Sequence, residues 1–255
     1  MRIRHLIALP LLALSGCLGL LMPEVEVPKL TGTFRVLFIG NSHTYENNVP
    51  AMVQAIARQS GNYELQTAKV AFPNFALEDH AYEGTALKAL QGSDWEYVVL
   101  QQGTSAAPSS QDHLRGWSTW WAPHIAAANA EPVMYQIWPH VTRRFDAPAA
   151  LDSYTGAAIA INALLAPAGD GLTAALDSNA DIRVYSGDGL HASRRGAYVA
   201  ALTILARLLP IDVESLPPEI PGSSDPELVV RELQRAAARA LARNPARPAT
   251  SVLRR

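Results

Sequence analysis

The sequence predicts an α/β domain built as a three-layer α/β/α sandwich around about five parallel strands. Short apolar runs rich in β-branched residues alternate with longer stretches of helical spacing, the order expected when helices cross over between parallel strands. The chain has 255 residues, of which 49% are hydrophobic and 17% charged, enough to bury one good core. No internal repeat and no low-complexity tract interrupts the pattern.

Five apolar runs are expected to form the strands. Each is short and rich in β-branched, aromatic or other apolar residues, as in strands that are buried on both faces of a parallel sheet. The expected strands are 36–39, 63–71, 97–100, 132–137 and 164–166.

Apolar residues at helical spacing fill the segments between these strands. The first helix follows a turn that ends in Pro50, and the second stretch is only loosely helical. The expected helices are 49–60, 77–90, 111–129, 151–161 and 193–209. Together with the strands they predict a domain over residues 34–212.

The composition changes after residue 212. Prolines, Gly222 and two serines make the next stretch resemble a linker, and a helix is expected to start near Asp225. Its apolar residues recur at helical spacing, so one face should pack on the domain, and its arginines should form a solvated face. We therefore expect residues 213–255 to be a linker and a C-terminal helix.

The first residues have the pattern of a targeting segment. A basic start with Arg2 and Arg4 precedes an apolar core over residues 6–14, as in a signal peptide. Leu14-Ser15-Gly16-Cys17 resembles a bacterial lipobox, in which the cysteine becomes the lipid-modified first residue of the mature protein. It is the chain's only cysteine, which suits a thioether better than a disulfide. An ordinary signal peptide and a short uncleaved membrane anchor stay open.

The lipobox predicts where the protein lies in the cell. We expect a lipoprotein signal peptide over residues 1–16, lipidation of Cys17, and a proline-containing tether over 17–33. Leu18 stands where an aspartate would favour the inner membrane. The expected location is therefore the periplasmic side of the bacterial cell envelope, with the outer membrane favoured over the inner.

A serine directly follows the first predicted strand, at Gly40-Asn41-Ser42. The carboxyl edge of a parallel sheet is its usual ligand-bearing edge, so Ser42 is the candidate nucleophile. A serine hydroxyl needs a base, and Asp188 stands three residues before His191 on a glycine-containing turn. That spacing allows the carboxylate to fix the imidazole tautomer that accepts the serine proton.

These two motifs, Gly40-Asn41-Ser42 and Asp188-x-x-His191, resemble those of the SGNH (GDSL-like) hydrolase superfamily in the same order over residues 35–209. The resemblance implies a flavodoxin-like fold and ester hydrolysis through an acyl-serine. Ser42 would attack, His191 would act as base and then acid, and Asp188 would orient His191. No cofactor is implied, because the chemistry is proton transfer and oxyanion stabilisation.

The oxyanion hole of the family uses the serine amide, a glycine amide and an asparagine side chain, and the last two do not match here. Asn74 stands at the glycine position and still offers a backbone N–H. For the third donor we favour the side-chain amide of Gln102, while Gln101 and Ser105 stay open. The expected hole consists of Ser42, Asn74 and Gln102.

Several other partners are excluded or disfavoured. A formal net charge of −2 provides no electrostatic footprint for nucleic acid. The remaining histidines lack metal-ligand spacing, so no metal site is expected.

His43 is expected to line the pocket rather than to serve as the base. Three tryptophans lie at helical spacing, which favours core packing over a sugar platform: Trp117, Trp120 and Trp121.

The substrate remains open at this stage. By analogy with other envelope hydrolases, carbohydrate O-acetyl groups come first and lipid esters second. An acyltransferase of the same fold would share the whole triad. A non-catalytic glycan-binding lipoprotein would explain the departures at Asn74 and Ser105 but not the presence of the triad. The sequence does not indicate an oligomeric state.

Overall fold

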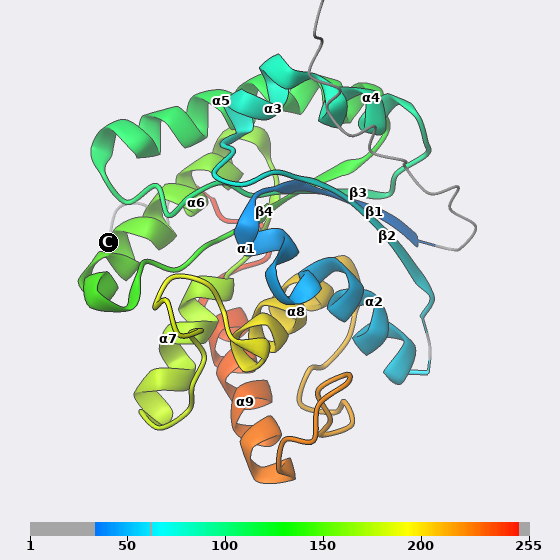
Figure 1. The fold of residues 1–255 in the computed structure, drawn as a ribbon. Helices are drawn as coiled ribbons and strands as arrows, with labels where there is room; N and C mark the ends of the chain where they lie inside the picture. The colour runs from blue at the N-terminus through cyan, green and yellow to red at the C-terminus, as the bar shows by residue number, and fades with distance from the viewer. Residues whose placement is uncertain (1–33, 62, 250–255) are drawn as a thin grey trace, which may run out of the picture.

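Five parallel strands form the centre of the molecule in the part that the computed structural model describes, residues 34–61 and 63–249. Their order in the sheet is β2-β1-β3-β4-β5, which confirms the predicted parallel α/β sheet (Figure 1). The signal peptide, Cys17 and the tether lie outside the described residues. The strands are β1 (Phe34–Gly40), β2 (Leu65–Ala71), β3 (Tyr97–Leu100), β4 (Glu131–Tyr135) and β5 (Leu164–Ala166).

The register of the strands brings their carboxyl ends to one edge. Gly40 at the end of β1 pairs with Ala71 of β2, and Ile39 pairs with Leu100 of β3. The segments that follow these three strands therefore meet beside one another, at the edge where ligands bind in open parallel sheets.

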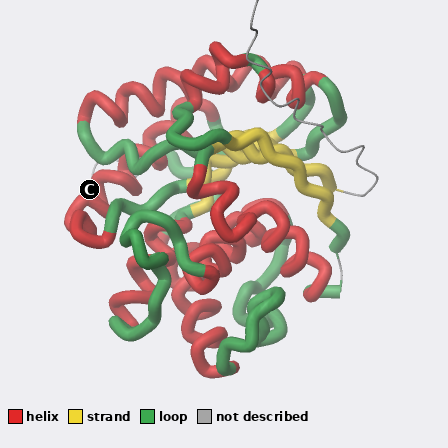
Figure 2. Tube along the Cα trace, in the orientation of Figure 1, coloured by secondary structure: helices red, strands yellow, loops and turns green. Residues whose placement is uncertain are grey.

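Helices cover both faces of the sheet, as Figure 2 shows. One layer contains α3 (Leu77–Glu83), α4 (Thr85–Gln91), α5 (Pro108–Ala127) and α6 (Ala147–Ile161). The other contains α2 (Val49–Gln59), α7 (Ala168–Ser178), α8 (Arg194–Leu208) and α9 (Glu227–Arg243). Short elements connect β1 to α2 and β4 to α6: α1 (Ser42–Tyr45), η1 (Glu46–Asn48) and η2 (Val141–Asp146). Among the described residues, no helix is both long and apolar enough to span a bilayer.

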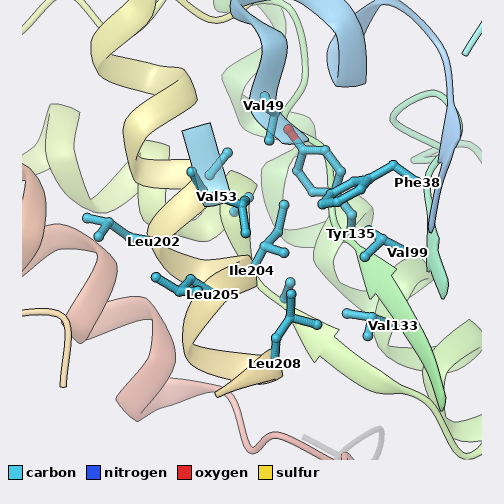
Figure 3. Close-up of a cluster of buried hydrophobic side chains, with 14 of the residues drawn as sticks. Phe38, Val49, Val53, Val99, Val133, Tyr135, Leu202, Ile204, Leu205 and Leu208 are labelled. Carbon is cyan, nitrogen blue, oxygen red and sulfur yellow. The ribbon is translucent and has the colours of Figure 1, made fainter. Parts of the chain in front are cut away.

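Part of the hydrophobic core lies between the sheet and the layer of α2 and α8. Phe38, Val99 and Val133 project from three neighbouring strands toward Val53 of α2 and Ile204 of α8, and all five are fully buried (Figure 3). Burial on this scale is the main favourable term that holds α8, and the loop before it, in place.

Two helical segments differ from the sequence expectation. The stretch 77–90 is two helices, because Gly84 adopts a φ of +86° and ends α3 before α4 begins. Helix α7 was not predicted, since its first turn contains Gly169 and Gly171, which are poor helix formers. Both lie against other elements: a Cβ on Gly169 would come within 2.4 Å of Gln136 Nε2, and one on Gly171 within 2.8 Å of Val199 Cγ1.

Residues 213–226 form an irregular segment, and α9 then packs against α7 and α8. Arg207 of α8 holds this end of the chain, because its guanidinium donates to the carbonyls of Leu165 (2.7 Å) and Asn244 (2.6 Å). Burial lowers the pKa of Arg207 to about 10, so the group stays charged at neutral pH.

Candidate active site

Ser42 begins the short helix α1, directly after β1. Gly40, the last residue of β1, is needed for space and not for an unusual φ: a Cβ there would lie 2.3 Å from Gln101 Oε1 and 2.5 Å from Thr44 Oγ1. Close packing of β1 against the end of β3 requires the glycine.

Gln101 organises the turn that carries Ser42. Its Oε1 accepts hydrogen bonds from the Asn41 backbone N–H and the Thr44 hydroxyl, both at 2.8 Å. Its Nε2 donates to Asn41 Oδ1 (2.9 Å) and to the Gln102 carbonyl (2.5 Å). The side chain is fully buried, and both ends of its amide are used in these contacts. Gln101 is thus a support of the nucleophile turn, and it has no free donor for a substrate.

Asn41 ties the nucleophile turn to the segment after β2. Its Nδ2 donates to the Phe75 carbonyl at 2.9 Å. Asn74, the residue before, has a φ of +61° and lies exposed in a turn. Asparagine tolerates this left-handed conformation better than most residues, which explains how it can replace a glycine there. The segment expected to supply a backbone donor is thus linked directly to the residue before Ser42.

Gln102 lies buried at the end of β3. Its Nε2 donates to Ser105 Oγ at 3.0 Å and lies 3.5 Å from His113 Nδ1, while its Oε1 accepts from the Leu77 N–H at 3.2 Å. Ser105 has a φ of +55°, and its hydroxyl donates to the Gly103 carbonyl. For Gln102 to donate to an oxyanion, its amide would have to exchange one of these contacts for the substrate.

The loop before α8 holds the aspartate and histidine of the second motif together. Asp188 Oδ2 lies 2.6 Å from His191 Nδ1, and Asp188 Oδ1 accepts from Ser186 Oγ (2.6 Å) and from the backbone N–H groups of Leu190 and His191. The Ser186 hydroxyl, followed by His191 and the two amides, holds the pKa of the Asp188 carboxyl well below its usual range. The ionised carboxylate therefore assigns the proton of His191 to Nδ1 and leaves Nε2 as a base.

Nε2 of His191 is buried and, among the described residues, has no hydrogen-bond partner. The imidazole lies against the nucleophile turn, because its ring centroid is 5.4 Å from that of His43, the residue after Ser42. Asn47 adds a second link, since its Nδ2 donates to the Ala192 carbonyl at 2.9 Å. The fold thus places the pair of Asp188 and His191 beside the turn that carries Ser42.

The segment after β4 supports the loop of Asp188 and His191. Trp138 Nε1 donates to the Leu190 carbonyl at 2.9 Å, and His140 Nε2 lies 3.1 Å from the Asp188 carbonyl. Gly189, with a φ of +70°, is required here because a Cβ would lie 2.7 Å from Val141 Cγ1 and 3.0 Å from His140 Nε2. Trp138 and His140 follow β4, which ends at the same edge of the sheet as β1. The supporting role of Gln101 was not predicted from the sequence, where two consecutive polar residues after a buried strand were the available signal.

His43 forms a neutral wall of the site. Its ring contacts Trp138 edge to face, with centroids 5.3 Å apart, and its Nδ1 is buried with no partner among the described residues. Burial, and then the nearby His191, lower the pKa of His43 to about 4, whereas Asp188 opposes the shift. A neutral ring without a link to a carboxylate does not have the arrangement of the catalytic base.

The burial of His43 makes stability depend on pH. Its folded pKa lies below its unfolded value of 6.5, so the unfolded chain binds more protons between these values and stability rises as pH increases from about 4 to 6.5. The shift corresponds to roughly 3 kcal/mol. His43→Phe keeps a ring of similar shape and should flatten the dependence of the free energy of unfolding on pH in that window. Denaturant titrations at several pH values check this, and equal slopes in both proteins would contradict it.

The other histidines make contacts that do not suit a metal. His80 is buried with Nε2 2.8 Å from the Gly40 carbonyl, and burial lowers its pKa. His113 Nε2 pairs with Glu78 at 2.8 Å. Across residues 34–61 and 63–249, no group of three histidine, cysteine or acidic side chains is arranged to hold a metal ion.

No protein-family model and no curated protein matches this chain. Its fold is nevertheless shared with solved structures. A DUF4886 family protein from Bacteroides uniformis superimposes with a TM-score of 0.71 at 20% identity, over 86% of this chain and 98% of that one. A protein assigned to the SGNH hydrolases, from Slackia heliotrinireducens, gives 0.57 at 24% identity, over 69% and 98%.

A variant of an acetyl xylan esterase from Geobacillus stearothermophilus gives a TM-score of 0.53 at 13% identity, over 70% of this chain and 96% of that one. At identities this low, the likeness shows a common fold. The chain thus has the α/β fold of SGNH hydrolases. Residues 40–42 lie at the carboxyl end of β1, and residues 188–191 lie in the loop before α8.

Proposed function

We propose that this chain is a serine ester hydrolase that works through an acyl-serine intermediate. One observation carries the proposal: the hydrogen bond of 2.6 Å between Asp188 Oδ2 and His191 Nδ1, with Nε2 of the same ring buried beside the Ser42 turn and without a partner among the described residues. This is the arrangement that an activated serine nucleophile requires. The common fold with SGNH hydrolases supports it.

The reaction has two steps. Ser42 Oγ attacks the ester carbonyl carbon and transfers its proton to His191 Nε2. The bond between that carbon and the alcohol oxygen then breaks as His191 returns the proton to the leaving alcohol. Water next attacks the acyl-serine and gives a proton to His191. The bond to Ser42 Oγ then breaks as His191 returns that proton to Oγ, and the acid is released. Asp188 remains ionised throughout and stabilises the imidazolium.

Three donors are proposed for the oxyanion: the backbone N–H groups of Ser42 and Asn74 and the side-chain amide of Gln102. The hydrogen bond from Asn41 to Phe75 supports the pairing of the first two, because it joins the two turns that carry them. Gln102 is preferred to Gln101, whose amide is used entirely by the nucleophile turn. Such donors stabilise the charge that develops on the carbonyl oxygen during attack.

For the substrate we propose O-acetyl groups of carbohydrates, with lipid esters as the second choice. The structural likeness to an acetyl xylan esterase favours the first. An acetyl group is small, which suits a half-buried nucleophile on a turn that lies against the ring of His191. Fold alone does not specify substrate, so the acyl group must be identified by assay.

A fluorophosphonate probe tests the nucleophile. The purified mature domain should become labelled at Ser42, with one probe per chain by intact mass. Ser42→Ala should abolish the label, whereas Ser110→Ala, a serine at the surface start of α5, should retain it. Absence of labelling in the wild type, or labelling that persists in Ser42→Ala, would exclude the proposed reaction.

The proposed location is the bacterial cell envelope, on its periplasmic side, through a lipid on Cys17. Stable anchoring takes two or more acyl chains, which a lipidated cysteine at the mature N-terminus would carry. Cys17→Ser should therefore leave the precursor unlipidated and release it from the membrane fraction. Metabolic labelling with a fatty-acid analogue checks this, and equal labelling of mutant and wild type would overturn the lipobox interpretation.

A further inference from the structure

Aromatic side chains form a continuous row along the outer side of α5, beside α3. This aromatic row consists of His113, Trp117, Trp120 and His124 of α5 with Tyr82 of α3. Centroid distances between neighbouring rings are 6.4, 5.8 and 4.4 Å along α5, and Tyr82 lies 5.4 Å from Trp117. The four α5 residues are three or four positions apart, so they share one face of the helix.

The row lies at the surface, which corrects the expectation that all three tryptophans of α5 pack in the core. Trp121 does so: it is fully buried, and its Nε1 donates to the Leu77 carbonyl. Trp117 is only partly buried, Trp120 is 37% exposed and Tyr82 is 76% exposed. Of the three tryptophans of α5, one thus packs in the core and two lie at least partly at the surface.

One end of the row reaches the candidate active site. His113 contacts Glu78 through Nε2 and lies 3.5 Å from the Gln102 amide through Nδ1. From His113 to His124 the row extends for eleven residues of α5, about 16 Å at the helical rise. The His113 end of the row therefore adjoins Gln102, the proposed oxyanion donor.

The chemistry of the row suits a sugar chain. Among the described residues of α3 and α5, every exposed large hydrophobic side chain is aromatic. The ring planes of Tyr82 and Trp117, and of Trp117 and Trp120, are inclined by 68° and 54°, so they do not cover one another face to face. Aromatic faces attract the C–H groups of a pyranose, while imidazoles can bond its hydroxyls. The acidic and basic side chains of α5, Asp112 and Arg115, pair with each other, which favours a neutral ligand on this helix.

We propose that the aromatic row is a binding surface for a neutral polysaccharide chain, which it holds while one ester group of that chain lies at Ser42. The proposal rests on the proposed ester hydrolase function and names its substrate as a polymeric glycan ester. The continuity between the row and Gln102 argues for this occupant over a lipid surface or a second copy of the chain, because neither of these would extend into the site.

Binding without turnover provides the first test. In a Ser42→Ala background, mobility is measured in native gels that contain deacetylated xylan, mixed-linkage β-glucan or glycol chitin. The protein should be retarded by at least one of them, and Tyr82→Ala combined with Trp120→Ala should weaken the binding roughly tenfold, since each ring contact contributes modestly. Phe145→Ala is the matched control, because Phe145 is equally exposed at 76% and lies outside the row. Its retardation should equal that of the parent.

Turnover provides the second test. The ratio of kcat/KM for acetylated xylan to that for p-nitrophenyl acetate should fall about tenfold in the double variant and stay constant in Phe145→Ala. Circular dichroism checks that the double variant is folded. Absence of retardation by all three polymers, or an equal loss in Phe145→Ala, would overturn the glycan surface. The glycan surface would also be overturned if the double variant still bound the polymers as the parent does but no longer bound lipid vesicles, or no longer formed a dimer. Failure of the ester hydrolase itself would appear separately, as absence of turnover for both esters.

Discussion

His191→Ala is expected to lower kcat by about 10⁴-fold or more on any ester that the wild type hydrolyses. The reason is local: Nε2 of His191 is the acceptor that the Asp188 carboxylate prepares, and among the described residues it has no other partner. Initial rates with p-nitrophenyl acetate at high enzyme concentration measure the loss. Asp188→Asn should produce a loss of similar size, because the amide no longer favours the proton on Nδ1 of His191.

Both variants should remain folded. His191 and Asp188 lie in the loop before α8 and outside the hydrophobic core, so thermal unfolding serves as the control for folding. A His191→Ala protein that retained more than a tenth of the wild-type kcat would show that another group acts as base. His43 would then be the next candidate to substitute, since its ring adjoins both His191 and Trp138.

Gln102→Ala is expected to lower kcat by roughly 10²–10³, with KM nearly unchanged, if its amide donates to the oxyanion. The bond would strengthen only in the transition state, so binding of the substrate should not depend on it. Ser105→Ala should be mild, because it removes a contact of Gln102 Nε2 and no donor to the substrate. Steady-state kinetics on one small acetate ester compare the two.

Gln102→Glu is the matched control for this prediction. The carboxylate keeps an acceptor for the Leu77 N–H but has no donor, and its charge opposes that of the oxyanion. The loss should therefore be at least as large as in Gln102→Ala. A larger effect of Ser105→Ala than of Gln102→Ala would instead assign the third donor to Ser105. Small losses from both would leave a hole of two backbone amides.

The elements with strong local signals were predictable from residues alone. The bounds of β3 and β5 agree with the expected ranges, because a buried parallel strand is a short apolar run that ends where polar or turn residues begin. The run expected at 132–137 extends beyond β4, which ends at Tyr135. Gln136 and Ile137 stay buried after the strand, since the segment continues inward to support the loop of Asp188. Composition alone does not distinguish strand β4 from the buried segment that follows it.

Features that depend on contacts between distant segments of the chain could not be predicted from the sequence. Helix α7 has two glycines in its first turn, and their cost in helix propensity is offset by close contacts with Gln136 and Val199. Those contacts join segments far apart in the chain. The same holds for the tryptophans of α5, where identical spacing leaves Trp121 in the core and Trp120 at the surface.

The candidate site divides in the same way. Ser42, Asp188 and His191 could be proposed as a triad from two short motifs, because that chemistry requires particular residue types at short spacing beside a strand end and a turn. The roles of the two glutamines after β3 could not. Gln101 and Gln102 are adjacent and chemically identical, but the first bonds to Asn41 and Thr44 and the second to Leu77 and Ser105. A side-chain amide can donate to a substrate only where its neighbours leave a hydrogen free, and those neighbours are brought together by the folded sheet.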